Sequence, residues 1–476
     1  DCLLSRGLGD VYKRQIMNKI SCFLPYAGKE QVEKTVNSLQ ATGLIEEIRL
    51  ITTDATLESL PDCEILFVDM PYSSATLKAI ANAAKGEYTL LYTKETTLEM
   101  GMFALERMIH ILEDSSAGMV YADHYQIADG KQSNAPVIDY QFGSLRDDFN
   151  FGSLLLFNTE KLKEAAGHMK SDYNFAGLYD LRLKLSQHSN LVHINEYLYS
   201  EVENDTRKSG EKIFDYVDPK NRDRQIEMEQ ACTEHLKEIG GYLAPEFKKI
   251  EFSAGNFEYE ASVIIPVRNR IRTIRDAIKS VLMQKTDFKY NLIIIDNHST
   301  DGTTEAIDEF KDDERLIHIV PERNDLGIGG CWNVGVHHPK CGKFAVQLDS
   351  DDVYKDENTL AIMVRAFYEQ NCAMVVGTYM MTDFNMNMIA PGIIDHKEWT
   401  PANGRNNALR INGLGAPRAF YTPVLREVKV PNTSYGEDYA LGLNFSRQYQ
   451  IGRVYDVVYL CRRWDDNSDA SLDIVK

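Results

Sequence analysis

Residues 261–266 read ASVIIP, a short apolar run closed by a proline, and a segment with helical periodicity, RIRTIRDAIKSVL, follows it. A second apolar run, NLIIID, ends at Asp296. Apolar runs that alternate with helical patterns predict strands joined by crossover helices, which together form a largely parallel sheet. The stretch therefore predicts an α/β fold for the C-terminal half of the chain.

The first half of the chain opens in the same way. Residues 20–25 read ISCFLP, lead into the helical pattern KEQVEKTVNSL and are followed by the run IRLITTD, which ends at Asp54. Further on, AAKGEYTLLYTKE aligns without a gap with PKCGKFAVQLDSD when Gly86 is set against Gly342. The shared order of these matches indicates an internal duplication, so we expect two tandem Rossmann-like domains with mostly parallel sheets.

A length of 476 residues suits two domains better than one. We expect these domains at residues 17–206 and 258–476, joined by a helical linker at 207–257 that contains DRQIEMEQACTEHLKEIGGYL. Residues 1–16 resemble translated adapter sequence, so we expect them to be a non-native extension before a natural start at Met17.

The overall composition narrows the class of protein. A net charge of −19 argues against a nucleic-acid partner and against broad attachment to anionic lipid. The eight cysteines form no CxxC pair, which is typical of reduced thiols in a cytosolic protein. No run approaches the roughly 18–20 apolar residues that span a bilayer. The sequence therefore predicts a cytoplasmic protein that is soluble or at most peripheral at a membrane.

The strongest candidate site is the tetrapeptide Asp349-Ser350-Asp351-Asp352, directly after the apolar run at residues 344–348. Open α/β sheets bind ligands at the carboxyl ends of their strands. Carboxylates packed this closely repel one another unless a cation neutralises them. Mg²⁺ or Mn²⁺ suits such oxygen ligands and usually binds through one or two carboxylates plus substrate phosphates. An acidic turn that caps the next helix is the alternative explanation.

Four motifs occur in order in the second half: SVIIPVRNR, IIIDNHSTDGT, NDLGIGGCWNVG and FAVQLDSDD. In order and spacing they resemble family 2 glycosyltransferases, over essentially all of residues 260–476. The resemblance implies a GT-A fold, a UDP- or GDP-sugar donor, inversion at the anomeric carbon and a saccharide or lipid-linked acceptor. It also implies a divalent cation, Mg²⁺ or Mn²⁺, on Asp349 and Asp351. The first half is then a degenerate GT-A-like copy.

Carried over position by position, the resemblance implies a set of donor contacts. They are Pro266, Val267, Asn269, Asp296, Asn324, Asn333, Asp349, Ser350 and Arg463. Asp296 would accept a hydrogen bond from the nucleotide base, although a helix-capping turn is an alternative use for it. Asn324 and Asn333 flank a glycine-rich run that equally suits plain turn chemistry. Arg463 would neutralise phosphate charge, unless it forms an ordinary surface ion pair.

Residues 435–439, YGEDY, open another helical pattern, ALGLNFSRQ. Sugar transfer with inversion needs a base that takes the proton of the acceptor hydroxyl. The motif resembles the acidic pair that supplies this base in the family. We therefore expect Asp438 to be the base and Glu437 to position the acceptor, with the reverse assignment open. An acidic helix N-terminus, favoured by the helix dipole, is the alternative.

The first half lacks most of these features. Residues 93–95, TKE, stand where the second half has residues 349–351. This segment has one carboxylate fewer and contains Lys94, so we expect no ordinary metal site there. Tyr179 and Asp180 are the candidate counterparts of the later acidic pair. We expect this half to be structural, acceptor-binding or dimer-forming rather than catalytic.

Two other functions compete with a glycosyltransferase. A glycan-binding or scaffolding protein would result if both copies had decayed, and the intact acids of the second half weigh against this. A sugar nucleotidyltransferase normally has a glycine-rich, basic loop after the first strand, whereas residues 266–270, PVRNR, contain no glycine.

Overall fold

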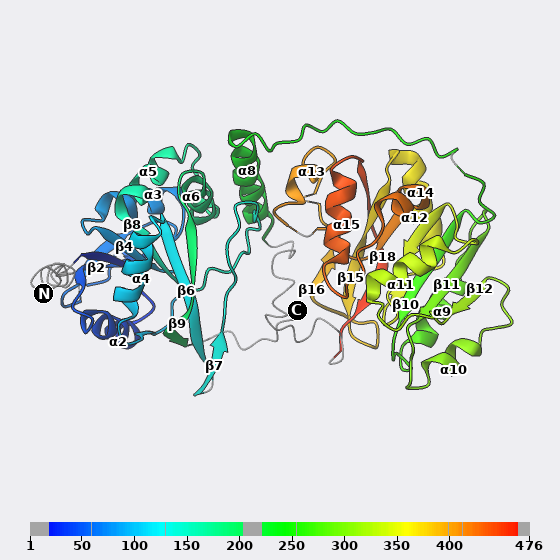
Figure 1. The fold of residues 1–476 in the computed structure, drawn as a ribbon, viewed down its shortest axis with the longest axis horizontal. Coiled ribbons are helices and arrows are strands. Elements are labelled where there is room, and N and C mark those ends of the chain that lie inside the picture. Colours follow the sequence, from blue (N-terminus) through cyan, green and yellow to red (C-terminus); the bar gives the residue numbers. More distant parts are fainter. Residues whose placement is uncertain are drawn as a thin grey trace, which may run out of the picture. The chain divides into compact units, whose positions relative to one another are not determined.

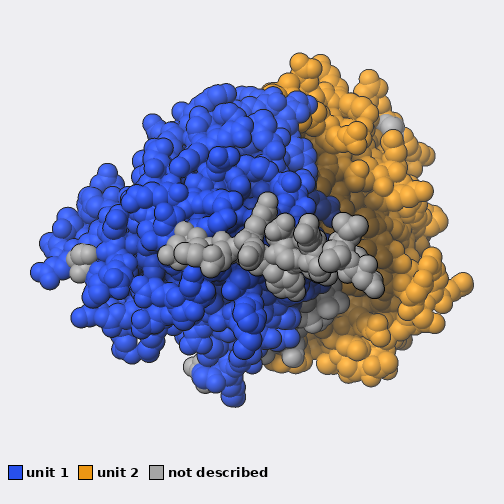
Figure 2. Space-filling model, turned by 60° about the vertical axis from the view of Figure 1, so that its left-hand side comes forward, with its two compact units in different colours: residues 1–207, 226–240 blue, residues 208–225, 241–476 orange. Residues whose placement is uncertain are grey.

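The computed structural model describes most of the chain (Figure 1). The described residues are 19–58, 60–128, 130–202, 221–253, 255–397, 399–411 and 413–464. The chain divides into two compact units, which Figure 2 shows in different colours. Unit 1 comprises residues 1–207 and 226–240, and unit 2 comprises residues 208–225 and 241–476. The expected extension at 1–16 lies outside the described residues.

Unit 1 contains a nine-stranded sheet in the order β3-β2-β1-β4-β8-β6-β9-β5, and β7 pairs with β6. Its strands are β1 (Ile20–Pro25), β2 (Ile45–Thr52), β3 (Glu64–Phe67), β4 (Tyr88–Tyr92), β5 (Leu98–Met100), β6 (Met119–Ala128), β7 (Lys131–Ala135), β8 (Leu154–Asn158) and β9 (Leu191–Val202). Its helices are α2 (Lys29–Gln40), α3 (Ser74–Ala83), α4 (Ala104–Asp114), α5 (Thr159–His168), α6 (Gly177–Ser186) and most of α8 (Arg222–Glu238).

Unit 2 contains a second nine-stranded sheet, in the order β12-β11-β10-β13-β17-β15-β18-β14, and β16 pairs with β15. Its strands are β10 (Ala261–Val267), β11 (Tyr290–Asp296), β12 (Leu316–Ile319), β13 (Phe344–Gln347), β14 (Val353–Tyr354), β15 (Met374–Thr382), β16 (Met388–Ile394), β17 (Arg418–Tyr421) and β18 (Ile451–Arg462). Its helices are α9 (Ile274–Leu282), α10 (Thr303–Asp308), α11 (Ile328–His337), α12 (Thr359–Gln370), α13 (Gly404–Asn407), α14 (Thr422–Val428) and α15 (Glu437–Ser446).

The two sheets have the same strand order, position by position, and the same pairing directions. In each sheet most strands run in one direction, and β8 or its counterpart β17 is inserted antiparallel between two of them. The predicted duplication and the α/β fold of two tandem GT-A-like units are therefore confirmed.

One detail of the duplication explains the aligned glycines. In unit 1 the backbone N–H of Gly86 donates to Ser21 Oγ at 2.8 Å, and in unit 2 that of Gly342 donates to Ser262 Oγ at 2.6 Å. A Cβ on Gly342 would lie only 2.6 Å from the backbone carbon of Ala261. The chain approaches the first strand too closely there for any side chain, so glycine is required in both copies.

The central strands of unit 2 place the candidate site. β10 is buried at every position and pairs in parallel with β11 and β13. A continuous apolar run is typical of a strand covered on both faces. Because parallel strands end at the same edge, the residues after β10, β11 and β13 come together there. Among the described residues, no helix is both long and apolar enough to cross a bilayer.

Candidate active site

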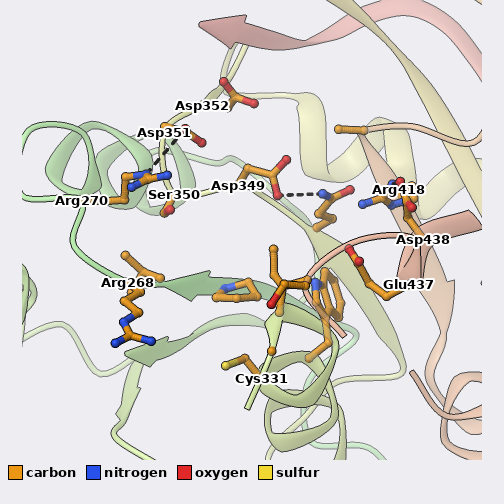
Figure 3. A pocket seen from close by; sticks show the side chains of 18 of the residues that line it. Arg268, Arg270, Cys331, Asp349, Ser350, Asp351, Asp352, Arg418, Glu437 and Asp438 are labelled. Carbon is orange, nitrogen blue, oxygen red and sulfur yellow. Dashed lines mark hydrogen bonds and ion pairs between the residues drawn. The ribbon is translucent and has the colours of Figure 1, made fainter. Parts of the chain in front are cut away.

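A cavity of about 560 Å³ opens in unit 2 at the carboxyl ends of β10 and β13 (Figure 3). Acidic residues reach it from two segments far apart in the sequence. They are Asp349, Asp351 and Asp352 after β13, and Glu437 and Asp438 at the start of α15. The basic residues in its lining are Arg268, Arg270, Arg418 and Arg463. The cavity therefore brings the two acidic motifs of the sequence into one site.

The three aspartates after β13 have different partners. Asp349 accepts hydrogen bonds from Gln347 Nε2 at 2.8 Å and from the Tyr459 hydroxyl at 3.2 Å. Asp351 Oδ2 lies 3.7 Å from Arg270 Nε (Figure 3). Asp352 Oδ1 accepts from a backbone N–H of β18 at 2.7 Å, so this carboxylate anchors the turn to the sheet.

These aspartates lie in an environment that disfavours so much negative charge. Burial raises the pKa of Asp349, and repulsion from Asp351 adds to the effect, although Arg418 opposes it. Burial raises the pKa of Asp352 well above its usual range, and repulsion from Asp351 and Asp349 adds to it. A positive charge added to the cavity would relieve this repulsion.

The aspartates fit a divalent cation only as part of a larger site. Within the described ranges, no group of three or more His, Cys, Asp and Glu side chains is arranged to hold a metal ion. Mg²⁺ and Mn²⁺ often bind through one or two carboxylates and complete their coordination with substrate phosphates and water. Asp349 and Asp351 supply such a partial site, and their mutual repulsion favours a cation between them.

Glu437 and Asp438 begin α15, directly after Gly436, whose φ of 77° lies in the left-handed region. Asp438 Oδ2 accepts from Arg418 Nη1 at 2.9 Å, and Oδ1 accepts from the backbone N–H of Tyr439 at 2.7 Å. Glu437 Oε2 is buried without a hydrogen-bond partner in the part of the chain that the structure describes. Burial, followed by repulsion from Asp438, raises the pKa of Glu437.

The structure separates the predicted donor contacts into two groups. Pro266, Val267, Asp349, Ser350 and Arg463 line the cavity. Arg463 and its neighbour in sequence have different surroundings, because Arg462 is 1% exposed and donates from Nε to the backbone oxygen of Asp351. Arg462 therefore holds the acidic turn in place, while Arg463 lines the cavity.

Asp296 lies outside the cavity lining and is fully buried. Its carboxylate accepts from the Ser299 N–H at 3.0 Å and from the Thr304 hydroxyl at 2.5 Å. Burial alone would raise its pKa, but contacts with His318, Ser299 and Thr304 lower it far below the usual value. These bonds correspond to the turn-capping alternative. The next residue, Asn297, lines the cavity instead and donates to the Leu326 carbonyl at 2.9 Å.

Three predicted asparagine contacts also lie outside the lining. Asn269, with a φ of 54°, accepts from the Thr300 N–H at 2.8 Å and so ties two loops together. Asn333 donates to the Val430 carbonyl at 2.6 Å and accepts from the same residue's N–H, which joins α11 to the segment before α15. Asn324 is exposed on a loop.

Sequence reasoning did not identify Arg418, Arg270, Tyr459 or Gln347. Arg418 carried a usable signal, because a charged residue at the start of the buried run RAFY is unusual in a central strand. Tyr459 and Arg270 gave none, because their roles depend on β18 and on the loop after β10 reaching the end of β13, which no local pattern indicates. Gln347 acts locally, since it donates to Asp349 two residues further along the chain.

The corresponding strand ends of unit 1 hold a polar cluster instead. Glu201 is fully buried, and its Oε1 lies 2.5 Å from Lys94 Nζ and 3.2 Å from His124 Nε2. The Ser153 hydroxyl donates to the other oxygen of Glu201. Burial alone would raise the pKa of Glu201, but the contacts with His124 and Lys94 lower it to about 2.

Strand pairing shows which residues of unit 2 stand in the same places. In unit 1 His124 pairs with Tyr199, and in unit 2 Tyr379 pairs with Tyr459, so Tyr379 is the counterpart of His124 and Tyr459 that of Tyr199. Glu201 lies two residues after Tyr199 and therefore corresponds to Cys461. By the alignment from Gly86 and by the pairing of β8 and β17, the counterparts of Lys94 and Ser153 are Ser350 and Ala416. All four counterparts, Tyr379, Cys461, Ser350 and Ala416, line the cavity of unit 2. The cluster of Lys94, His124, Ser153 and Glu201 therefore occupies the cavity position of unit 1.

The acidic pair has no counterpart in unit 1. Helices α6 and α15 each have ten residues, and the strand that follows begins at the same distance, at Leu191 and Ile451. The places of Glu437 and Asp438 are therefore taken by Gly177 and Leu178. Tyr179 and Asp180, which were expected to correspond to Glu437 and Asp438, lie two residues further along the helix than the equivalent positions. Asp180 is also fully buried.

Comparison with known proteins gives a family match within unit 2. Residues 262–419 match the family described as Glycosyl transferase family 2. A Rickettsia felis protein described as an uncharacterized glycosyltransferase is 37% identical over 198 residues, which cover 41% of this chain and 31% of that protein. A Campylobacter jejuni protein named GalNAc(5)-diNAcBac-PP-undecaprenol beta-1,3-glucosyltransferase is 36% identical over 93 residues, which cover 19% of this chain and 29% of that protein.

The matches thus span about a third of each of these relatives. Among solved structures, S. aureus TarS in complex with UDP-GlcNAc is similar with a TM-score of 0.37 and 21% identity, over 45% of this chain and 62% of that one. The family match contains the four motifs that lie between residues 262 and 352 of unit 2. Unit 2 therefore contains a family 2 glycosyltransferase domain.

Proposed function

We propose that unit 2 is an inverting glycosyltransferase that moves a sugar from a UDP- or GDP-sugar to a hydroxyl group of a saccharide or lipid-linked acceptor. The observation that carries this proposal is that Asp349 and Asp351 line the same cavity as Glu437 and Asp438. A site of this composition offers both a place for a cation and diphosphate and a carboxylate base. The family 2 domain supports the same reaction class.

The donor end of the site is the turn after β13. Asp349 and Asp351 would hold Mg²⁺ or Mn²⁺, which when bound neutralises charge on the leaving diphosphate. Arg463, which lines the cavity, supplies further positive charge to the phosphates. Pro266, Val267 and Asn297 also line the cavity. The first two would form an apolar wall for the nucleotide, and Asn297 would contact its base.

The acceptor end of the site is the start of α15. In the proposed step the acceptor oxygen bonds to the anomeric carbon while the bond from that carbon to the diphosphate oxygen breaks. The electron pair of that bond leaves with the diphosphate, and Asp438 takes the proton of the acceptor hydroxyl. A direct displacement of this kind inverts the anomeric configuration. Glu437, which lines the same cavity, would position the acceptor.

The role proposed for unit 1 is not catalytic. Its cluster around Glu201 occupies the cavity position, and Gly177 and Leu178 replace the acidic pair. A structural, acceptor-binding or dimer-forming role is compatible with these substitutions.

Calorimetric titration of the full chain with UDP and with GDP, each with and without MnCl₂, tests the donor assignment. We expect one of the two to bind, and binding to weaken sharply without the cation and in Asp351→Ala. The release of nucleoside diphosphate from UDP-glucose, UDP-GlcNAc, UDP-galactose and GDP-mannose then tests turnover. Arg365→Met, on the exposed surface of α12, is the matched control for handling and folding. Binding of neither nucleotide by the folded protein would contradict the proposed function.

A further inference from the structure

We infer that Arg418 is a positioning residue that holds the Asp438 carboxylate in place to receive the acceptor proton. The inference rests on the proposed function and assigns a role to a residue that none of the sequence motifs contains. Arg418 begins β17, is 9% exposed and lines the cavity beside Asp438 (Figure 3).

The contacts of Arg418 fix its guanidinium from two sides. Nη1 donates to Asp438 Oδ2 at 2.9 Å and to the backbone oxygen of Leu414 at 3.2 Å. The Leu414 bond ties the guanidinium to the chain just before β17. Strand β17 is paired with both β13 and β15. The hydrogen bond from Arg418 therefore connects the proposed base on α15 to a strand inside the sheet.

The geometry at Asp438 leaves room for the acceptor. One of its oxygens receives Arg418, and the other receives the N–H of Tyr439. Each carboxylate oxygen has two lone-pair sites, so a hydroxyl group in the cavity can still donate to either oxygen. The two bonds restrict rotation of the carboxylate and select one orientation toward the cavity.

Charge also links Arg418 to the same group. Its guanidinium forms an ion pair with Asp438 at the edge of a cavity whose lining includes four other acidic residues, Asp349, Asp351, Asp352 and Glu437. Arg418 is therefore the positive partner of the proposed base in a site rich in carboxylates.

The comparison between the units supports a link between Arg418 and the acidic pair. Backbone bonds from Thr159 to Glu87 and from Thr422 to Lys343 align β8 with β17, so Leu155 is the counterpart of Arg418. Leu155 is a buried core residue. In unit 1 the arginine and the acidic pair are therefore both missing, although the strand and the helix that carried them remain.

The test measures turnover and nucleotide binding separately in full-length Arg418→Met, Arg418→Lys and Arg365→Met. The substrate is whichever of UDP-glucose, UDP-GlcNAc, UDP-galactose and GDP-mannose the unaltered protein turns over. We expect kcat to fall on the order of 100-fold in Arg418→Met, because small misplacements of catalytic groups have effects of this size. The Kd for UDP or GDP with MnCl₂ should change less than about threefold, since the donor end of the site is intact. Arg418→Lys should recover about a tenth or more of kcat, and guanidinium ion added to Arg418→Met should raise its rate.

Asp438→Asn and the double variant Arg418→Met/Asp438→Asn complete the test. If Arg418 acts through Asp438, the double variant loses no more activity than Asp438→Asn alone. An unchanged kcat in Arg418→Met, or a loss explained by nucleotide affinity and melting temperature, would overturn the inference and leave the proposed function standing. Absence of turnover and nucleotide binding in the unaltered protein would overturn the proposed function itself, and the inference with it.

Discussion

In unit 1 the end of β4 is followed by Lys94, whose ammonium group pairs with the buried Glu201. In unit 2 the matching end of β13 is followed by Asp349 and Asp351, with Ser350 between them facing the cavity. Both units have the same strand order, so the difference lies in how each one neutralises the acids at one edge of its sheet.

The difference shows how a ligand site can be lost while the fold is kept. A buried carboxylate is costly unless a positive or hydrogen-bonding group compensates it. Lys94, His124 and Ser153 compensate Glu201 from within the chain, so unit 1 needs no ligand to do so. In unit 2, burial and repulsion from Asp351 still raise the pKa of Asp349, although Arg418 opposes the shift and Arg270 lies 3.7 Å from Asp351. A bound cation would relieve the remaining repulsion.

The largest effect should come from the acidic pair that unit 1 lacks. Asp438→Asn removes the proposed base while it keeps the size of the side chain, so kcat should fall about 10³-fold. The Kd for UDP or GDP with MnCl₂, measured by titration, should stay within about threefold. A variant that retains most of the original kcat would assign the base to Glu437, and Glu437→Gln distinguishes the two.

Transfer of the unit 1 lysine into unit 2 should have the next largest effect. Ser350→Lys places an ammonium group beside Asp349 and Asp351, at the position that Lys94 holds in unit 1, where it would compete with a cation. We expect MnCl₂-dependent affinity for UDP or GDP to fall about 100-fold, a size typical of disturbed metal sites. Titration with and without MnCl₂ measures it. Full retention of MnCl₂-dependent binding would show that the two strand ends are not equivalent.

The cluster in unit 1 should make its stability depend on acidity. The pKa of Glu201 is about 2 in the folded protein, below its usual value of 4.5. A lowered pKa contributes stability that is complete above the unfolded value and is lost as the pH falls toward the folded value. We therefore expect the protection of β9 amides to fall by about 2 kcal/mol between roughly pH 5 and pH 2. Hydrogen exchange measures it.

Glu201→Gln is the control for this pH dependence. It should be less stable than the original protein at pH 5, and the two should converge below pH 2, as Glu201 becomes protonated in the folded state as well. Parallel curves for the two proteins would contradict the assignment of the effect to Glu201.

The smallest effect should come from removal of the unit 1 lysine. Lys94→Met leaves Glu201 with His124 and Ser153 only, and the partly exposed Lys94 side chain limits the loss to about 1 kcal/mol of unfolding free energy. Hydrogen exchange of β9 measures the loss, and turnover by unit 2 should be unaffected. Lys29→Met, at an exposed ion pair on α2, should change stability by less than about 0.5 kcal/mol.

Much of the fold could be predicted because its signals are local. The apolar runs of β1 and β10, each closed by a proline, and the glycines at 86 and 342 marked the same unit twice. The acidic turn after β13 and the acidic start of α15 were recognisable because each motif is contiguous in the chain. The counterpart of the acidic pair in unit 1 was misplaced by two residues, because sequence similarity there is too weak to fix the register that helix length and strand pairing define.

The polar donor contacts were harder to predict. Asp296 and Asn269 belong to motifs that resemble the family, yet their side chains bond to neighbouring loops instead of facing the cavity. A polar side chain next to a site satisfies whichever partner lies nearer, and that distance depends on how two loops meet. Asn297 and Arg463 line the cavity, and their place there also depends on how the loops meet.

The sequence by itself determined the repeated α/β unit, the acidic motifs and the lysine that stands in the first copy where the second has Ser350. Each of these follows from residue types at short separations along the chain. Only the tertiary structure decided that Arg418 pairs with Asp438 and that Lys94 pairs with Glu201, 107 residues away. Such pairs are set by strand order and register, since these bring together residues whose separation in sequence carries no periodic signal.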